Sequence, residues 1–276
     1  MKIKLYFILI LVFNLSFSQT KRYIYELSYK PDSTEAYYKK NFMVVDINPK
    51  EVKYYDYKFL EKDSLNILQK SQNLIWTTQI PVVRKRNSNT HINYPLIGDN
   101  IYAYPTQDPI KWKLENDTKN YLGFKVQKAT TDFGGRKWIA WFTKEIPFSE
   151  GPYKFQGLPG LILQIKDTQE NYIFNLIKST NLPETYNTTN IIEVRYGDTP
   201  IPTNEKTVIK KALEYFNDPF NDIRQEFNRK AISSFEYNGV KYKPEELSKL
   251  VKEEQEDILK SYNPIERNKA FPYPKN

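Results

Sequence analysis

The side chains that most often do chemistry in enzymes are scarce in this chain. It has no cysteine and a single histidine, His91, which lies in a polar, asparagine-rich segment and is expected to be an ordinary surface residue. Zinc sites built on imidazole or thiolate groups, and cysteine nucleophiles, are therefore excluded. A serine triad would need His91 and has no G-x-S-x-G turn, and no glycine-rich phosphate loop is present. The sequence predicts no metal, no cofactor and no catalytic residue of these kinds.

Carboxylates remain as candidates for acid–base chemistry. Four of them flank the central part of the chain: Asp132, Glu145, Glu150 and Asp167. A glycosidase needs two carboxylates at a defined separation across a cleft, and sequence spacing does not give that separation. The alternative is that each acid belongs to a turn at the end of a strand, with Asp167 placed to accept hydrogen bonds from its own turn. A glycan or peptide hydrolase using two of these acids is one hypothesis.

Aromatic residues are abundant, with 22 Tyr, 16 Phe and 4 Trp. A large sheet accounts for most of them, because aromatic side chains suit strands. They also suit a groove for acyl chains or a stacking platform for sugars. The densest aromatic and aliphatic run covers residues 136–167, and six of its side chains are the expected binding residues: Trp138, Trp141, Phe142, Tyr153, Phe155 and Leu158.

This run predicts a strand over 136–143, a stiff bend over 145–160 and a second strand over 161–166. The residues to which we assign a structural role are Pro147, Gly151, Pro152, Gly157, Pro159, Gly160 and, beginning the next turn, Asp167. Proline fixes φ and glycine permits positive φ, so the bend is expected to hold one shape. It is either a corner between strands or a rigid lip that presents Tyr153, Phe155 and Leu158 to a ligand.

The same run resembles the signature of the GLPGLI family, secreted proteins of Gram-negative bacteria named for the string at residues 157–162. The matching positions include Gly135-Arg136, residues 140–143, Ile146-Pro147, residues 151–153, Phe155 and Asp167. A weaker resemblance begins near Trp112. Family members often carry Cys where this chain has Val126, so no thiol role is carried over. The family is largely uncharacterised, and the resemblance implies an envelope setting but no catalytic residue.

The strand around Trp138 is apolar on both faces. Trp138, Ala140 and Phe142 share one face, and Ile139 and Trp141 share the other, because successive side chains of a strand alternate. Such a strand must be covered twice. One cover is the core, and the other is expected to be a C-terminal helix or a bound apolar ligand.

The N-terminal residues 1–18 predict a secretory signal peptide with cleavage between Ser18 and Gln19. Their apolar run is short for a membrane span, and no later segment is longer, so an integral membrane protein is not expected. The protein is expected in the periplasm, at the outer membrane or outside the cell. The formal net charge of +8 falls to about +6 without Lys2 and Lys4. Outside the cytoplasm this basic charge favours lipid phosphates, lipopolysaccharide or acidic glycans over nucleic acid.

The expected fold class is α+β, in a single domain over residues 19–262. A large, strongly curved antiparallel sheet resembling a half-barrel spans residues 20–200, helices over 204–262 pack on it, and residues 263–276 form a loose tail. The strands are expected at 23–29, 42–47, 52–60, 73–79, 82–84, 122–129, 137–143, 161–166, 172–179 and 191–195, with a polar loop over 87–100. Helices are expected over 205–216, capped by Asn204, and from Pro219 and Pro244, with a hairpin turn at Asn238-Gly239.

The first hypothesis for function is a non-enzymatic envelope protein that binds a lipid or another apolar or amphipathic ligand, or an envelope protein, at the curved sheet. A dry interior filled by side chains would count against it. A third hypothesis is a structural accessory of an outer-membrane complex, with the bend over 145–160 docking a partner.

Overall fold

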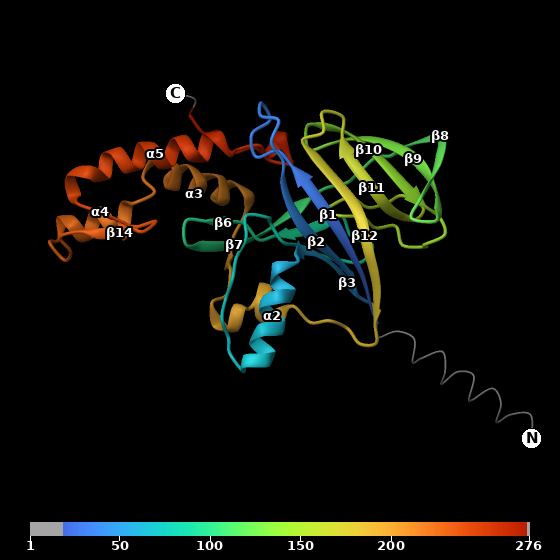
Figure 1. The fold of residues 1–276 in the computed structure, drawn as a ribbon, viewed down its shortest axis with the longest axis horizontal. Helices are drawn as coiled ribbons and strands as arrows, with labels where there is room; N and C mark the ends of the chain where they lie inside the picture. The colour runs from blue at the N-terminus through green and yellow to red at the C-terminus, as the bar shows by residue number, and fades with distance from the viewer. Residues whose placement is uncertain (1–18, 275–276) are drawn as a thin grey trace, which may run out of the picture.

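The structure is a computed structural model that describes residues 19–274 of the chain, so the expected signal peptide lies outside the described residues. It has the α+β class expected from the sequence, with one large sheet and helices gathered mainly in the C-terminal third (Figure 1). Neighbouring strands of the sheet are antiparallel except β13 and β7, and the sheet is not closed into a barrel. Within residues 19–274, no helix is long and apolar enough to cross a membrane.

Thirteen strands make this sheet, in the order β13-β7-β5-β4-β3-β2-β1-β12-β11-β10-β9-β8, with β6 paired to β7. Their bounds are β1 Thr20–Tyr29, β2 Lys39–Ile47, β3 Glu51–Asp56, β4 Val82–Lys85, β5 Thr90–Asn93, β6 Leu96–Ile97, β7 Asn100–Gln107, β8 Lys113–Tyr121, β9 Phe124–Phe133, β10 Arg136–Thr143, β11 Leu161–Asp167, β12 Tyr172–Leu182 and β13 Ile201–Pro202.

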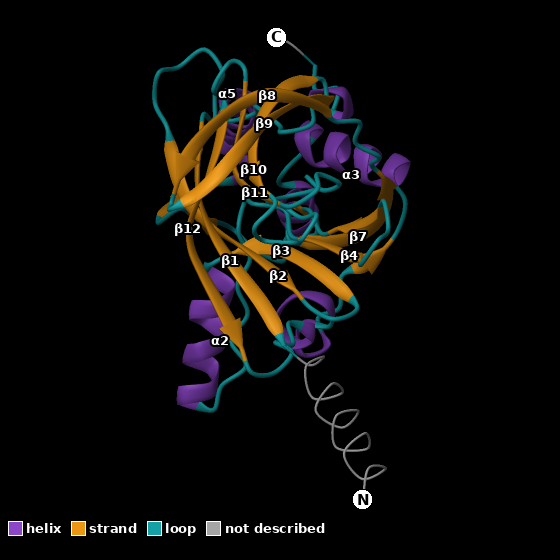
Figure 2. Ribbon diagram, turned by 90° about the vertical axis from the view of Figure 1, so that its right-hand side faces the viewer, coloured by secondary structure: helices purple, strands orange, loops and turns teal. Residues whose placement is uncertain are grey.

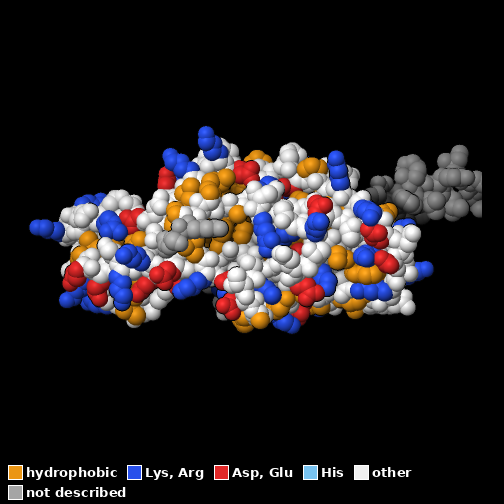
Figure 3. Space-filling view, turned by 90° about the horizontal axis from the view of Figure 1, so that it is seen from above, with side chains coloured by type: hydrophobic (Ala, Val, Ile, Leu, Met, Phe, Trp, Pro, Cys, Tyr) orange, Lys and Arg blue, Asp and Glu red, His pale blue; other side chains and the backbone are white. Residues whose placement is uncertain are grey.

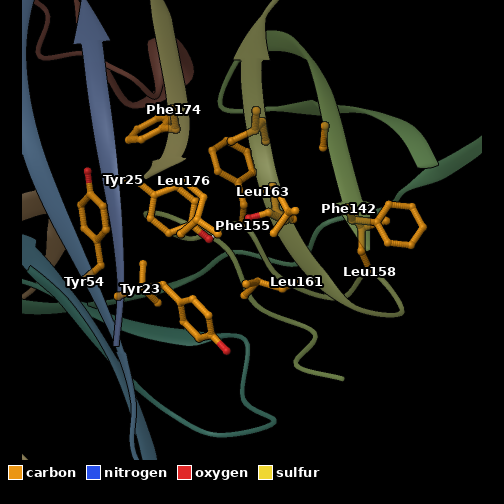
Figure 4. Close-up of a cluster of buried hydrophobic side chains, with 14 of the residues drawn as sticks. Tyr23, Tyr25, Tyr54, Phe142, Phe155, Leu158, Leu161, Leu163, Phe174 and Leu176 are labelled. Carbon is orange, nitrogen blue, oxygen red and sulfur yellow. Dashed lines mark hydrogen bonds between the residues drawn. The ribbon is translucent and has the colours of Figure 1, made fainter. Parts of the chain in front are cut away.

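The sheet is strongly curved, so that β8 to β11 face β1 to β3 across the interior (Figure 2). Buried side chains from both halves form one core, in which Tyr25 of β1 and Leu163 of β11 are both fully buried (Figure 4). The Tyr25 hydroxyl donates a hydrogen bond to the carbonyl of Ile162, at 2.7 Å, across this core. The alternating apolar residues of β1 thus bury one face of the strand against the opposite half of the sheet.

The bend over residues 145–160 fills the hollow of the curved sheet. Phe155 and Leu158 are each 1% exposed, and the Phe155 ring centroid lies 4.6 Å from that of Trp138. Gly160 has φ of 146°, and a methyl group there would lie 1.9 Å from the carbonyl oxygen of Thr143. Only glycine permits that approach. The bend is therefore more than a simple corner, because it places Phe155 and Leu158 in the core.

The helices divide between the sheet and a separate lobe. Helix α2 (Lys58–Gln69) packs Phe59 and Leu60 on the sheet, and α3 (Glu205–Asn217) packs Val208 and Ala212 beside β7. Helix α4 (Asn221–Asn228), helix α5 (Leu247–Lys260) and the hairpin of β14 (Phe235–Tyr237) and β15 (Val240–Tyr242) share a small core of their own, and project from one end in Figure 1. Only part of the C-terminal helical region thus covers the sheet as expected.

Several local predictions are confirmed. Asn204 caps α3 by accepting a hydrogen bond from the Thr207 amide at 2.9 Å. Asn238 and Gly239 both have positive φ, as a type I′ hairpin turn requires. Pro244 opens the 3₁₀ turn that leads into α5.

Other local predictions are wrong. The expected strand over 52–60 ends at Asp56 and continues as α2, and the segment 73–79 forms no strand. The segment 191–195 lies mostly in the helical turn Thr189–Glu193, and the polar loop over 87–100 contains β5 and β6. Helix α4 begins two residues after Pro219. The apolar runs over 52–60, 73–79 and 191–195 each fit either a strand or a helix, and tertiary packing decides between them.

The expected loose tail is also wrong in its first part. The C-terminal strap (residues 261–271) packs against the turn between β9 and β10, with Asn263 8% and Glu266 6% exposed. The Arg136 guanidinium donates hydrogen bonds to Asn263 Oδ1 at 2.6 Å and to the carbonyls of Pro264 and Ile265 at 2.8 and 3.0 Å. These hydrogen bonds use two backbone carbonyls and one amide side chain of the strap, which leave no apolar pattern in the sequence.

Candidate tyrosine pocket

A hollow of about 290 Å³ lies between the C-terminal strap and the strands β1, β3, β7 and β12. We call it the tyrosine pocket, because six tyrosines line it: Tyr29, Tyr54, Tyr104, Tyr153, Tyr172 and Tyr262. Its wall is mainly apolar, with Phe174 and Ile265 between the tyrosines. The pocket combines aromatic faces with a few polar groups, which is the usual composition of a small-molecule site.

Three of these tyrosines carry hydroxyl groups that are available to a ligand. The Tyr153 hydroxyl donates to Glu266 and the Tyr172 hydroxyl donates to the carbonyl of Asn263, at 2.5 and 2.6 Å. The hydroxyls of Tyr29, Tyr54 and Tyr104 have no hydrogen-bond partner within residues 19–274. Tyr54 is only 4% exposed, and its hydroxyl is accessible from the pocket rather than sealed in the core. A ligand in the pocket would satisfy it.

Burial keeps the hydroxyls of Tyr54 and Tyr104 in their neutral form. It raises the pKa of Tyr54 well above its ordinary value, and the nearby charge of Asp56 acts in the same direction. Burial likewise raises the pKa of Tyr104. At neutral pH each hydroxyl is therefore both a donor and an acceptor.

A charged cluster of Lys154, Asp108, Glu266 and Lys269 lies at the floor of the tyrosine pocket, where Glu266 and Lys269 line the hollow and Lys154 and Asp108 are buried beneath them. Lys154 Nζ lies 2.6 Å from Glu266 Oε1 and 3.1 Å from Asp108 Oδ2. Lys269 Nζ lies 2.5 Å from Asp108 Oδ1 and 3.0 Å from Glu266 Oε2. Two ammonium groups thus balance two carboxylates, and the floor presents no net charge to the pocket.

His91 lies behind this cluster and is fully buried, so its expected surface position is wrong. It occupies an inward-facing position of the short strand β5, which the polar character of the segment concealed. Its Nδ1 is 3.2 Å from Asp108 Oδ2. Burial lowers the pKa of His91, and Asp108 opposes that effect only in part.

Asp108 is held as a carboxylate. Burial alone would raise its pKa, but the contact with His91 and the positive charges of Lys154 and Lys269 bring it well below its usual range. A general acid needs the opposite shift. Within residues 19–274, no group of three or more His, Asp or Glu side chains could hold a metal ion.

Tyr153 connects the bend to this floor. Its φ of 56° is rare for a residue with a side chain. That conformation lets the ring pack edge to face on Tyr54, with centroids 5.7 Å apart, while the hydroxyl reaches Glu266. A backbone held in this way is a marker of functional constraint.

The six expected binding residues do not form one site. Trp138, Phe142, Phe155 and Leu158 are between 0% and 1% exposed and belong to the core, out of reach of a ligand. Tyr153 lines the tyrosine pocket. Trp141 points away from the core, because the side chains on either side of it in β10 are buried.

The four candidate acids do not converge either. Glu150 is buried in an ion pair with Arg84. Asp167 lies 3.3 Å from Arg136 and accepts a hydrogen bond from the Tyr172 amide at 2.8 Å.

Asp132 and Glu145 are exposed, and Glu145 accepts from the Lys125 amide at 3.0 Å. The hydrolase hypothesis required two of these four acids in one cleft, and the structure places them in separate surroundings. The carboxylates that do meet, Asp108 and Glu266, are far apart in the sequence and carried no local signal.

Charge is mixed over the surface. Figure 3 shows Lys and Arg side chains interspersed with Asp and Glu, and scattered apolar side chains between them. The excess of basic residues therefore forms no single basic face in this view.

Comparison with known proteins gives a family likeness and a fold likeness. A family model described as a protein of unknown function (Porph_ging) matches residues 134–164, which cover β10, the bend and the start of β11. The match overlaps the run that carries the GLPGLI resemblance, but it does not confirm the GLPGLI family name. No curated protein sequence matches the chain.

Among solved structures, the chain is similar to PNGF-II in two crystal forms, C2 and P21. The TM-scores are 0.53 and 0.52, the sequence identities are 15% and 14%, and each match covers 71% of this chain. The chain spans only a third of the length of PNGF-II. At this identity the likeness concerns the fold alone.

Proposed function

We propose that this chain is an exported, non-enzymatic protein of the cell envelope that holds a small amphipathic ligand in the tyrosine pocket. The proposed export rests on residues 1–18, which carry the pattern of a signal peptide. The observation that carries the proposed binding is the set of unpartnered hydroxyls of Tyr29, Tyr54 and Tyr104 in an otherwise apolar wall.

The pocket sets limits on this ligand. A volume of about 290 Å³ is at the small end for ligand sites, so the bound part is a ring or a short chain. The aromatic walls favour a ring face or an alkyl segment, and the free hydroxyls favour hydrogen-bonding groups. The balanced charged cluster favours a neutral ligand over an acid or a base.

The charged cluster supports a binding role rather than catalysis. Asp108 and Glu266 are each held by both lysines, and His91 is sealed behind them. Either carboxylate would have to break its ion pairs with Lys154 and Lys269 before it could act as a general acid or base. The cluster is better suited to fix the strap against the sheet.

A protein partner is a weaker alternative. The bend exposes Gly157 and Pro159 but buries Leu158, so it offers little apolar surface for docking. A pull-down from envelope extracts with Pro159→Glu as the control variant tests this alternative. Capture that the substitution abolishes would favour docking at the bend.

The binding proposal is tested by calorimetric titration with n-octyl β-D-glucoside below its micelle-forming concentration, a probe with one ring and one alkyl chain. We expect saturable binding that Tyr54→Phe weakens by about two- to tenfold, since one hydrogen bond contributes about 0.5–1.5 kcal/mol. Tyr37→Phe makes the same chemical change at a 64% exposed position and should leave binding unchanged. Absence of binding, or equal effects of the two substitutions, would count against the proposal.

A further inference from the structure

The sheet face that points away from the core carries a second hollow, which we call the outer groove. It has a volume of about 260 Å³ and lies over β10, β11 and β12. Its main lining side chains are Lys119, Ile139, Trp141, Gln164, Lys166 and Asn175. No C-terminal helix contributes to this lining, so the second cover expected for β10 is not a helix.

Polar side chains in the outer groove are joined into one chain across three strands. Lys119 Nζ donates to Gln164 Oε1 at 2.6 Å, and Gln164 Nε2 donates to Asn175 Oδ1 at 2.8 Å. The same ammonium lies 4.3 Å from the ring centroid of Trp141. The groove therefore combines a half-buried indole, two amides and a cation in a connected arrangement.

Lys119 is a positive charge without a carboxylate partner among residues 19–274. Its neighbours on this face differ, because Lys128 lies 3.1 Å from Asp117 and Lys166 pairs with Glu170. Burial lowers the pKa of Lys119, and the charge of Lys166 acts in the same direction. A bound anion would relieve both effects.

We propose that the outer groove binds an acidic saccharide, with the sugar carboxylate on Lys119. The ammonium would leave the indole face for the carboxylate, exchanging an exposed cation–π contact for a stronger charge-assisted hydrogen bond. The uncovered Trp141 ring then stacks on the sugar, and Gln164 and Asn175 bond its hydroxyls.

A saccharide fits this groove better than an acidic peptide or a lipid. The groove lies on the face of paired strands, whose backbone groups are already used in the sheet, so an extended peptide gains no main-chain bonds there. The apolar lining is limited to a few side chains such as Ile139 and Ile173, which is too little for an acyl chain.

The test is a titration of the protein with trigalacturonic acid and with its methyl ester, followed by tryptophan fluorescence and calorimetry. The two probes have the same rings, and the ester replaces each carboxylate with a neutral methyl ester. We expect the acid to bind at least about tenfold more tightly than the ester. Lys119→Gln should remove this preference for the acid, and Trp141→Leu should lower the affinity for both probes.

Lys113→Gln is the matched control, because Lys113 lies on the same strand and its side chain is 79% exposed. It should change neither affinity. The proposal is overturned if acid and ester bind equally or not at all, or if Lys119→Gln and Lys113→Gln have the same effect. It is also overturned if hexaglutamate binds as tightly as trigalacturonic acid. These outcomes are independent of the tyrosine pocket on the inner side of the sheet.

Discussion

The burial of Phe155 yields a quantitative prediction that separates a core role for the bend from a binding role. Phe155 is 1% exposed and packs on Trp138, Phe133 and Tyr153, with ring centroids 4.6, 5.4 and 6.4 Å away. Phe155→Ala would leave a cavity that these rings cannot close. Such truncations lower the free energy of unfolding by about 3–5 kcal/mol.

The assay is equilibrium unfolding in urea. With a urea dependence of about 3 kcal/mol per M for a chain of this size, the midpoint should fall by about 1–1.7 M. Phe42→Ala is the matched control, because Phe42 is 47% exposed on the outer face of β2. Its midpoint should shift by less than about 0.2 M.

A shift for Phe155→Ala as small as that for Phe42→Ala would refute the core role of the bend. Phe155 would then again be a candidate for contact with a ligand. An intermediate shift with an unchanged urea dependence would mean that the surrounding rings collapse into the cavity.

Three further predictions concern single side chains. Below about pH 6.5 the only histidine of the chain gains a proton in the unfolded state, whereas buried His91 stays neutral in the folded state. The free energy of unfolding should therefore fall as the pH is lowered from 7.5 to 5.0. The urea midpoint of His91→Gln should depend much less on pH. Arg136→Lys cannot keep the fork of hydrogen bonds to the C-terminal strap, so hydrogen exchange in the strap should speed up by about tenfold or more. Gly160→Ala should lower the free energy of unfolding by more than about 3 kcal/mol, because its methyl group would meet the Thr143 carbonyl. Gly157→Ala has only the strain of a φ of 95°, because its methyl group would lie in ordinary contact 3.9 Å from the Trp112 ring, and should cost about 1 kcal/mol in the same urea assay.

The parts of the fold that were predictable rest on local signals. Alternating apolar residues identify β1, continuous apolar runs identify β10 and β11, and the cap at Asn204 identifies α3. The hairpin turn at Asn238 and Gly239 needs only its own two residues. Each of these elements would form in much the same way in many folds.

The parts that were not predictable depend on contacts between distant segments. The strap is fixed because Arg136, on β10, donates hydrogen bonds to Asn263, Pro264 and Ile265. His91 looks polar and exposed in sequence, yet strand pairing with β7 carries it inside. The strap residues that Arg136 contacts lie 127–129 residues away in the sequence, and β5 is too short and polar to indicate its pairing with β7.

The tyrosine pocket shows the same limit. The tyrosine content of the chain indicated a stacking surface, but Tyr29, Tyr54, Tyr104 and Tyr172 come from four different strands. Of the six tyrosines that line the pocket, only Tyr153 belongs to the bend, so the sequence pattern of the bend predicted only that one. The other aromatic residues of the run proved to be core, because a buried ring and a ligand-binding ring have the same sequence pattern.

The most direct test of the account is the site of protection when n-octyl β-D-glucoside binds. Hydrogen exchange followed by mass spectrometry compares the free and the saturated protein. The account predicts slower exchange in the C-terminal strap and in the segment Thr78–Ile80, both of which line the tyrosine pocket. Unchanged exchange in both segments at saturation, or protection confined to other parts of the chain, would contradict it.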